Sequence, residues 1–167
     1  DNLMASNITT TTADLAWTEN GTTAIWNVEV VTAGSTPTGT PSASGVSNPY
    51  SATSLMSGTD YEFYVQADCG GGDLSNWIGP ISFTTLCSTF TAPYLEDFEA
   101  AAGSTPNCWA ESGGESWDYD NSAPSSGHIG DGGTLVGSTA SGGYFAWIDD
   151  SGSQAPSTLT SPLIDIS

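Results

Sequence analysis

Apolar residues recur at every second position in short segments of the first half of the chain, which is the pattern of a β-strand with one buried face. Residues 12–18, TADLAWT, and residues 25–31, IWNVEVV, both follow this pattern. Their apolar positions are Ala13, Leu15 and Trp17 in the first segment, and Trp26, Val28 and Val30 in the second. We therefore predict two strands here, each with these side chains turned inward.

The same spacing continues toward residue 86, beyond a stretch over 33–49 that is rich in Gly, Ser, Thr and Pro and shows no clear pattern. The predicted inward positions are Tyr61, Phe63, Val65 and Ala67 in SGTDYEFYVQADC, and Ile81 and Phe83 in GPISFTTL. The segment GGGDLSNW between them turns the chain back. Short strands separated by turn residues are typical of a β-sandwich.

The chain contains no lysine and no arginine, and its 19 acidic residues give it a formal net charge of −19. Without these cations it cannot neutralise phosphates, which excludes nucleic acid and anionic membrane surfaces as partners. No segment approaches the roughly 20 apolar residues of a membrane-spanning helix, so we expect no membrane insertion. Six Trp, six Tyr and five Phe supply a hydrophobic core, and we expect a folded all-β chain rather than a disordered acidic one.

Residues 1–86 resemble a fibronectin type III domain, an immunoglobulin-like β-sandwich. The residues that carry the resemblance are Leu15-x-Trp17, Leu55, Gly58-Thr59-x-Tyr61 and the closing Phe83-Thr84-Thr85. In that family the tyrosine at the position of Tyr61 forms the tyrosine corner, whose hydroxyl bonds to the backbone upstream. The resemblance implies core and corner roles for these residues, and no chemistry.

Residues 87–167 resemble the first half of a MAM domain, a jelly-roll β-sandwich used in adhesion outside the cell. The marks occur in the family order: Cys87, Asp97-Phe98-Glu99, Cys108-Trp109, Trp117, Gly143-Tyr144-Phe145 and Leu159-Thr160-Ser161-Pro162. The second half of such a domain is not in the sequence, so we expect the chain to be a segment of a longer protein. The combination resembles large secreted surface proteins of Bacteroidetes-type bacteria.

The three cysteines cannot all pair with one another. A hairpin that turns near Leu74 would place Cys69 opposite residue 79, roughly 25 Å from Cys87 at the rise of a strand, which argues against a Cys69–Cys87 bond. The resemblance implies a Cys87–Cys108 bond, the first disulfide of a MAM domain. Cys69 is then expected to be a buried thiol, with a partner in a longer chain as the alternative.

The segment YLEDFEA, residues 94–100, brings three carboxylates together in a chain without cations. One interpretation is a strand with Leu95 and Phe98 inward and solvated, salt-screened carboxylates. Since MAM and related jelly rolls often hold a cation beside their first strand, the resemblance implies a structural Ca²⁺, which takes six to eight oxygen ligands. The predicted ligands are Asp97 and Glu99, completed by Asp131 and Asp149. Asp118 and Asp120 form a rival cluster that could equally be an Asx-turn.

Catalysis is not predicted. A Ser–His–Asp triad would have to use His128, the single histidine, which lies in the loop-like SSGHIGDGG, and no set of zinc ligands is present. No spacing among the acidic residues singles out a glycosidase pair. Three tryptophans are candidates for stacking on sugar rings, although core positions are the commoner role of such residues: Trp77, Trp117 and Trp147.

These features predict a non-catalytic extracellular adhesion or stalk segment made of two successive β-sandwiches. Its expected partners are other extracellular proteins or glycans, or like subunits. One alternative is an accessory, carbohydrate-binding region of a secreted hydrolase. Another is a filament subunit that a strand of its neighbour completes.

Overall fold

The computed structural model describes residues 2–22, 25–99, 103–114, 116–120, 144–148 and 156–167. The regular secondary structure in this part of the chain consists of β-strands alone, which confirms the all-β fold class. The chain divides into two compact units, Asp1–Ser88 and Thr89–Ser167, called unit 1 and unit 2 below. No helix in the described part is long and apolar enough to cross a membrane.

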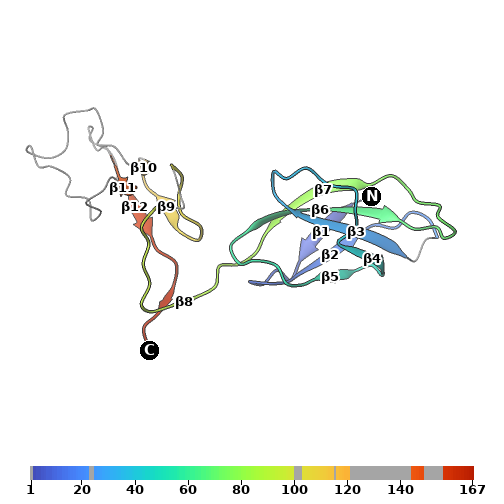
Figure 1. Ribbon diagram of the computed structural model, residues 1–167, viewed down its shortest axis with the longest axis horizontal. Helices are drawn as coiled ribbons and strands as arrows, with labels where there is room; N and C mark the ends of the chain where they lie inside the picture. Colours follow the sequence, from blue (N-terminus) through green and yellow to red (C-terminus); the bar gives the residue numbers. More distant parts are fainter. Residues whose placement is uncertain (1, 23–24, 100–102, 115, 121–143, 149–155) are drawn as a thin grey trace, which may run out of the picture. The chain divides into compact units, whose positions relative to one another are not determined.

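Unit 1 is a sandwich of two antiparallel sheets (Figure 1). Its strands are β1 (Leu3–Ser6), β2 (Ala13–Trp17), β3 (Trp26–Thr32), β4 (Ala43–Val46), β5 (Tyr50–Ala52), β6 (Asp60–Ala67) and β7 (Ile78–Thr84). One sheet has the order β1-β2-β5 and the other the order β4-β3-β6-β7. β3 and β6 pair along their whole length, from Trp26 opposite Ala67 to Thr32 opposite Tyr61.

The core of unit 1 lies between the two sheets, at the positions that alternation predicted. Leu15 of β2, Val28 of β3 and Phe63 of β6 are the largest fully buried side chains. Trp17 packs edge-on against Trp26, with ring centroids 5.3 Å apart. Strands with one buried face therefore close on each other as the sequence indicates.

The predicted partner strand is present as β7, and its two predicted inward residues differ in how far they are buried. Phe83 is buried, whereas Ile81 is 37% exposed. Ile81 lies opposite the buried Phe63, on the inner face, but β7 is the last strand of its sheet. A side chain on an edge strand has a neighbouring strand on only one side, so Ile81 stays partly in solvent.

A glycine and a proline shape the start of this edge strand. Gly79 has a φ of 145°, and a Cβ on it would lie 2.7 Å from the carbonyl oxygen of Phe63, so only glycine fits there. Pro80 has no N–H to offer to another strand. Such residues on an edge oppose pairing with a further chain.

The hydroxyl of Tyr61 accepts a hydrogen bond from the backbone N–H of Met56 at 2.9 Å, which confirms the predicted tyrosine corner. We expect Tyr61→Phe to lower the free energy of unfolding by about 1–3 kcal/mol, because the Met56 N–H loses its acceptor in a partly buried place. Urea denaturation would measure the change. Tyr64→Phe is the control, because the Tyr64 hydroxyl donates only to the nearby Glu62 carboxylate; an equal loss in both variants would contradict a corner role for Tyr61.

Two polar residues of β3 are buried, contrary to simple alternation. Glu29 is 2% exposed and Asn27 is 6% exposed. The Glu29 carboxylate accepts hydrogen bonds from the Thr38 N–H at 2.6 Å, the Thr38 hydroxyl at 2.7 Å and the Gly39 N–H at 3.0 Å. The segment between β3 and β4 thus folds back over the outer face of β3, and neutral donors satisfy a carboxylate that has no cation to pair with.

The residues of unit 2 that the structure describes form three separate two-stranded ribbons. Its strands are β8 (Phe90–Thr91), β9 (Ala110–Ser112), β10 (Asp118–Asp120), β11 (Phe145–Trp147), β12 (Thr158–Thr160) and β13 (Ile164–Asp165). β8 pairs with β13, β9 with β12 and β10 with β11. In the described part of unit 2 the buried residues are Pro106, Tyr119 and Pro162, a much smaller core than that of unit 1.

Candidate functional site

Residues 94–99 of the acidic segment YLEDFEA do not form a strand, so the interpretation as an alternating strand is wrong here. Leu95 is 83% exposed, and Phe98 has a φ of 61° and is only half-buried. The Glu96 carboxylate accepts from the Phe98 N–H at 2.8 Å, and the Asp97 carboxylate accepts from the Glu99 N–H at 3.1 Å. Such bonds between a side chain and the backbone two residues later compete with a strand ladder, which explains the irregular path.

Neutral donors hold the carboxylates of this segment. The Glu96 carboxylate accepts from the Tyr94 hydroxyl at 3.2 Å, which in turn accepts from the indole N–H of Trp109 at 3.1 Å. The Glu99 carboxylate accepts from the Tyr144 N–H at 2.8 Å. The acidic cluster is therefore held by hydrogen bonds from N–H and O–H groups rather than by ion pairs.

Glu111 in β9 is a second carboxylate of this kind. It accepts from the Thr105 hydroxyl, from the Trp117 N–H at 3.1 Å and from the Tyr119 hydroxyl at 2.8 Å. The hydrogen bond from Thr105 is the largest cause that lowers the pKa of Glu111. Burial, followed by the bond to Glu111, raises the pKa of Tyr119 to about 12.

We expect Glu111→Gln to destabilise unit 2 at neutral pH and to matter less in acid. Because the fold lowers the pKa of Glu111, the contribution of the ionised carboxylate is fully present above the unfolded value of 4.5 and is lost as the pH falls through the lower folded value. Amide exchange in β9 and β12, recorded for the wild type and for Glu111→Gln at several pH values, would measure the difference in stability. A difference between the proteins that does not shrink below pH 4.5 would contradict this role.

The predicted calcium ligands lie partly outside the described residues. Asp97 and Glu99 are exposed, and Asp131 and Asp149 belong to the part of the chain that the structure does not describe. The rival Asp118 is exposed in β10. No group of three or more potential ligands occurs among the described residues. The calcium site stays a prediction.

The tryptophans named as stacking candidates differ in their surroundings. Trp77 is half-buried, and its indole nitrogen lies 3.9 Å from where a Cβ on Gly39 would be. Trp117 is half-buried, and its indole nitrogen is buried without a hydrogen-bond partner in the described part of the chain. Trp147 lies opposite Asp118 in the ribbon of β10 and β11, and its side chain is outside the described residues. Sugar stacking by these three residues stays a prediction.

The predicted disulfide is present. Cys87 and Cys108 are both disulfide-bonded, and the third cysteine, Cys69, is a thiol, so the bond joins Cys87 to Cys108. The expectation that Cys69 is buried is wrong, because its side chain is exposed. The hairpin turns at Gly70–Gly72 rather than near Leu74, with the Cys69 N–H bonded to the Asp73 carbonyl at 2.9 Å, which leaves Cys69 beyond the end of β6.

Unit 2 contains a cavity of about 530 Å³ that the sequence did not reveal. It is lined by Phe90, Tyr94, Glu96, Ser104, Thr105, Pro106 and Asn107. The ring centroids of Phe90 and Tyr94 are 4.9 Å apart, and the Tyr94 hydroxyl donates to the carboxylate of the half-buried Glu96. Aromatic faces beside hydroxyl, amide and carboxylate groups can bind a polyhydroxylated or amine-bearing ligand. In the sequence, the only sign of this cavity is that Tyr94 and Glu96 are two residues apart, and the calcium hypothesis used neither of them.

The comparison with protein families places a match on unit 1. The fibronectin type III domain family matches residues 1–84, and a search of curated proteins found no match. A two-domain fibronectin type III segment of chicken tenascin is 23% identical over 51% of this chain and 48% of that segment, with a TM-score of 0.42. This chain thus spans about half the length of the tenascin segment.

Two further solved structures are each similar over about half of the chain. One comes from the computer-based redesign of a β-sandwich protein and is 23% identical over 52% of this chain and 93% of its own, with a TM-score of 0.41. The other is a myokine, 16% identical over 51% of this chain and 93% of its own, with a TM-score of 0.42. On the family match over residues 1–84, together with the two-sheet sandwich and the Tyr61 corner, the chain belongs to the fibronectin type III family.

Proposed function

We propose that this chain is a non-catalytic stalk and contact segment of a large protein that works outside the cell. Fibronectin type III domains are typically structural modules rather than enzymes. The Cys87–Cys108 disulfide favours an oxidising compartment, where such bonds persist. A surface without Lys or Arg suits contacts with extracellular proteins or glycans and not with nucleic acid.

The observation that carries the stalk role is where the chain enters and leaves unit 1. Leu3 at the start of β1 and Ile78 at the start of β7 line one cavity, so both strands begin at the same end. At the other end, the N–H of Leu86 bonds to the Thr9 carbonyl at 3.0 Å. The chain therefore enters the sandwich at one end and leaves at the opposite end (Figure 1).

Pulling the full chain between terminal handles in an optical trap would test this role. We expect unit 1 to unfold in one step at a defined force, because a pull between its ends runs along the strands and loads all strand pairs together. Gradual extension without such a step would contradict a stalk. For the location, an antibody against the chain should label intact cells of the source organism; labelling only after permeabilisation would contradict an extracellular role.

For unit 2 we propose the first half of a MAM-like jelly roll that further strands complete. Strands of two or three residues in two-stranded ribbons are at best marginally stable. Three apolar side chains of unit 2 are largely exposed: Leu95 at 83%, Leu163 at 77% and Ile166 at 86%. Further strands that pack on them would bury this apolar surface. The missing strands come either from a further segment of the same protein or from a neighbouring copy, as in a filament. Electron microscopy of concentrated protein separates the two, because only the second gives filaments.

The second candidate function is carbohydrate binding by an accessory region of a hydrolase. The cavity of unit 2 with Phe90, Tyr94 and Glu96 favours it. Oligosaccharides on a glycan array would test it, with Tyr94→Ala as the binding-site variant and Tyr50→Ala as a matched control in unit 1. Glycan binding that Tyr94→Ala abolishes and Tyr50→Ala preserves supports this function, and the absence of binding to any glycan contradicts it.

We further propose a structural Ca²⁺ that is bound through Asp97 and Glu99. Oxygen ligands from acidic residues suit this ion, and bound cations would offset part of the net charge. In a protein that carries the complete second domain, we expect EDTA at low ionic strength to lower the melting temperature of that domain, and Asp97→Asn with Glu99→Gln to remove that sensitivity. An unchanged melting curve with EDTA would contradict the site.

A further inference from the structure

The cavity of unit 2 places one carboxylate beside two aromatic rings. Phe90, Tyr94 and Glu96 line it, and the two ring centroids are 4.9 Å apart with the ring planes tilted by 55°. The Tyr94 hydroxyl lies 3.2 Å from the Glu96 carboxylate, to which it donates. The volume of about 530 Å³ lies within the range of small-molecule pockets, roughly 300–1,000 Å³. A small ligand that enters therefore meets aromatic and anionic groups together.

No lysine or arginine neutralises the charge of Glu96. Its two carboxylate oxygens accept from the Phe98 N–H at 2.8 Å and from the Tyr94 hydroxyl, and both of these donors are neutral. The sequence contains no lysine and no arginine, so no such side chain can pair with this carboxylate from any part of the chain. Of the described residues that line the cavity, Glu96 alone is charged. The cavity therefore attracts cations, and the net charge of −19 adds to that attraction.

Two hydroxyl groups of the cavity wall already donate their protons to carboxylates. Tyr94 donates to Glu96, and Thr105 donates to Glu111. The Tyr94 hydroxyl also accepts from the indole N–H of Trp109 at 3.1 Å. Since a hydroxyl has a single proton, these two oxygens can offer a ligand only acceptor lone pairs. A protonated primary amine, which has three donors and no acceptor, matches such a wall, whereas an anion does not.

The two rings add a second attraction for the same group. A cation is attracted to an aromatic face when it lies within about 6 Å of the ring centroid. The centroids of Phe90 and Tyr94 are closer to each other than that, so one cation can lie within reach of both rings. We propose that this cavity binds a ligand that carries a protonated primary amine, with the ammonium group beside Glu96 and against the two rings. Simple alkylamines and amino sugars both carry this group, and the inference does not depend on the carbohydrate-binding function proposed above.

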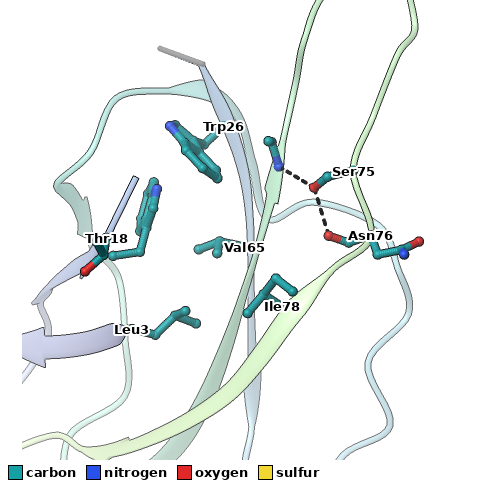
Figure 2. Close-up of a pocket in the computed structure, with 9 residues that line it drawn as sticks. Leu3, Thr18, Trp26, Val65, Ser75, Asn76 and Ile78 are labelled. Carbon is teal, nitrogen blue, oxygen red and sulfur yellow. Dashed lines mark hydrogen bonds between the residues drawn. The ribbon is translucent and has the colours of Figure 1, made fainter. Parts of the chain in front are cut away.

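The cavity of unit 1 differs in character. It has a volume of about 320 Å³, and Figure 2 shows Leu3, Val65 and Ile78 around an open space with Trp26 at its side. Trp17 also lines it, and none of its described lining residues is charged. Such a wall gives an amine no advantage over an alcohol of the same shape. The indole N–H signals of Trp17 and Trp26 therefore report whether a probe enters unit 1 instead.

The test compares two amines with alcohols of nearly equal shape: cyclohexylamine with cyclohexanol, and glucosamine with glucose. Each probe is titrated into the full chain at slightly acidic pH, where both amines are protonated, and the indole N–H signal of Trp109 is followed by ¹H–¹⁵N NMR. This signal reports on the site because the Trp109 N–H donates to the Tyr94 hydroxyl. We expect at least one amine to bind roughly tenfold more tightly than its alcohol, and added salt to weaken the amine alone.

The two pairs of probes separate the sources of the amine. A preference for the amine in the cyclohexyl pair alone assigns the cavity to simple amines, and a preference in the sugar pair alone assigns it to amino sugars. No preference in either pair would overturn the inference. Saturable binding of glucose in that case would leave the carbohydrate-binding function standing.

Variants locate the site. Glu96→Gln removes the charge at nearly constant shape, so each amine should then bind no more tightly than its alcohol. Glu62→Gln is the matched control and should leave the preference unchanged, because Glu62 also accepts from a tyrosine hydroxyl, that of Tyr64, but lies in unit 1. Asn107→Asp adds a carboxylate at an exposed position of the cavity wall and should strengthen amine binding, which keeps the test decisive if Glu96→Gln does not fold. A preference that survives Glu96→Gln, or that Asn107→Asp does not raise, would contradict the site.

Discussion

Phe63→Ala is expected to lower the free energy of unfolding of unit 1 by about 3–5 kcal/mol. Phe63 is fully buried at the centre of β6 and packs edge-on against Phe83 at 6.3 Å between ring centroids. Removing the ring loses its burial and leaves a cavity that both sheets would have to collapse to fill. Since a domain of this kind is stable by only about 5–15 kcal/mol, the loss is a large part of the total.

The measurement is urea denaturation monitored through amide exchange in β3 and β6, two strands that report on unit 1 alone. Ile81→Ala is the matched control, because Ile81 lies opposite Phe63 on the same face but is 37% exposed at the sheet edge. We expect it to lose about 1 kcal/mol, well below the value for a fully buried side chain. Equal losses for Phe63→Ala and Ile81→Ala would show that the core does not lie between the sheets at Phe63.

Glu29→Gln is expected to lower the free energy of unfolding of unit 1 by about 2–4 kcal/mol, although the two side chains have nearly the same shape. Hydrogen bonds to a charged group are each worth about 1.5–3 kcal/mol. An amide has one acceptor oxygen, and its NH₂ group would face donors from Thr38 and Gly39. At least one of the three donors would then be buried without an acceptor.

Glu62→Gln is the control for this substitution. Glu62 lies on β6 opposite Val31, is half-buried, and accepts only from the Tyr64 hydroxyl, at 3.3 Å, among the hydrogen bonds of the described residues. We expect a change within about 0.5 kcal/mol, as for most surface substitutions. Thermal melts of both variants at low and high salt would make the comparison. If Glu29→Gln is as mild as Glu62→Gln, then the Thr38–Gly39 segment does not depend on the carboxylate.

The sequence predicted a strand where burial against the opposite sheet fixes that segment, and missed features that depend on other contacts. β2, β3 and β6 were predicted because one face of each is buried by the opposite sheet, and burial imposes a period of two on the residues. β4 was missed because its sequence ASGV lies on a sheet edge and has almost no buried residue to mark it. The burial of Glu29 was missed because alternation assigns it to solvent and cannot foresee that the chain returns over it.

The sites were less predictable than the fold, for a related reason. The path of YLEDFEA is set by bonds from Glu96 and Asp97 to backbone N–H groups two residues later, which a pattern of apolar and polar positions does not describe. Trp17 was correctly expected in the core, but the cavity beside it depends on where two sheets stop covering each other. The disulfide and the Tyr61 corner could be assigned to residues in advance, because family resemblances implied both.

The entry and exit of the chain at opposite ends of unit 1 determine how the reach of such a protein grows with its length. β6 alone has 8 residues, which extend about 25 Å at the rise of a strand. In a row of such sandwiches the span of each is added to the next, so doubling their number doubles the distance covered. Doubling an unstructured linker increases its mean reach only about 1.4-fold. The reach of a long row of such modules therefore grows in proportion to its length, whereas the reach of a flexible chain grows only as the square root of its length.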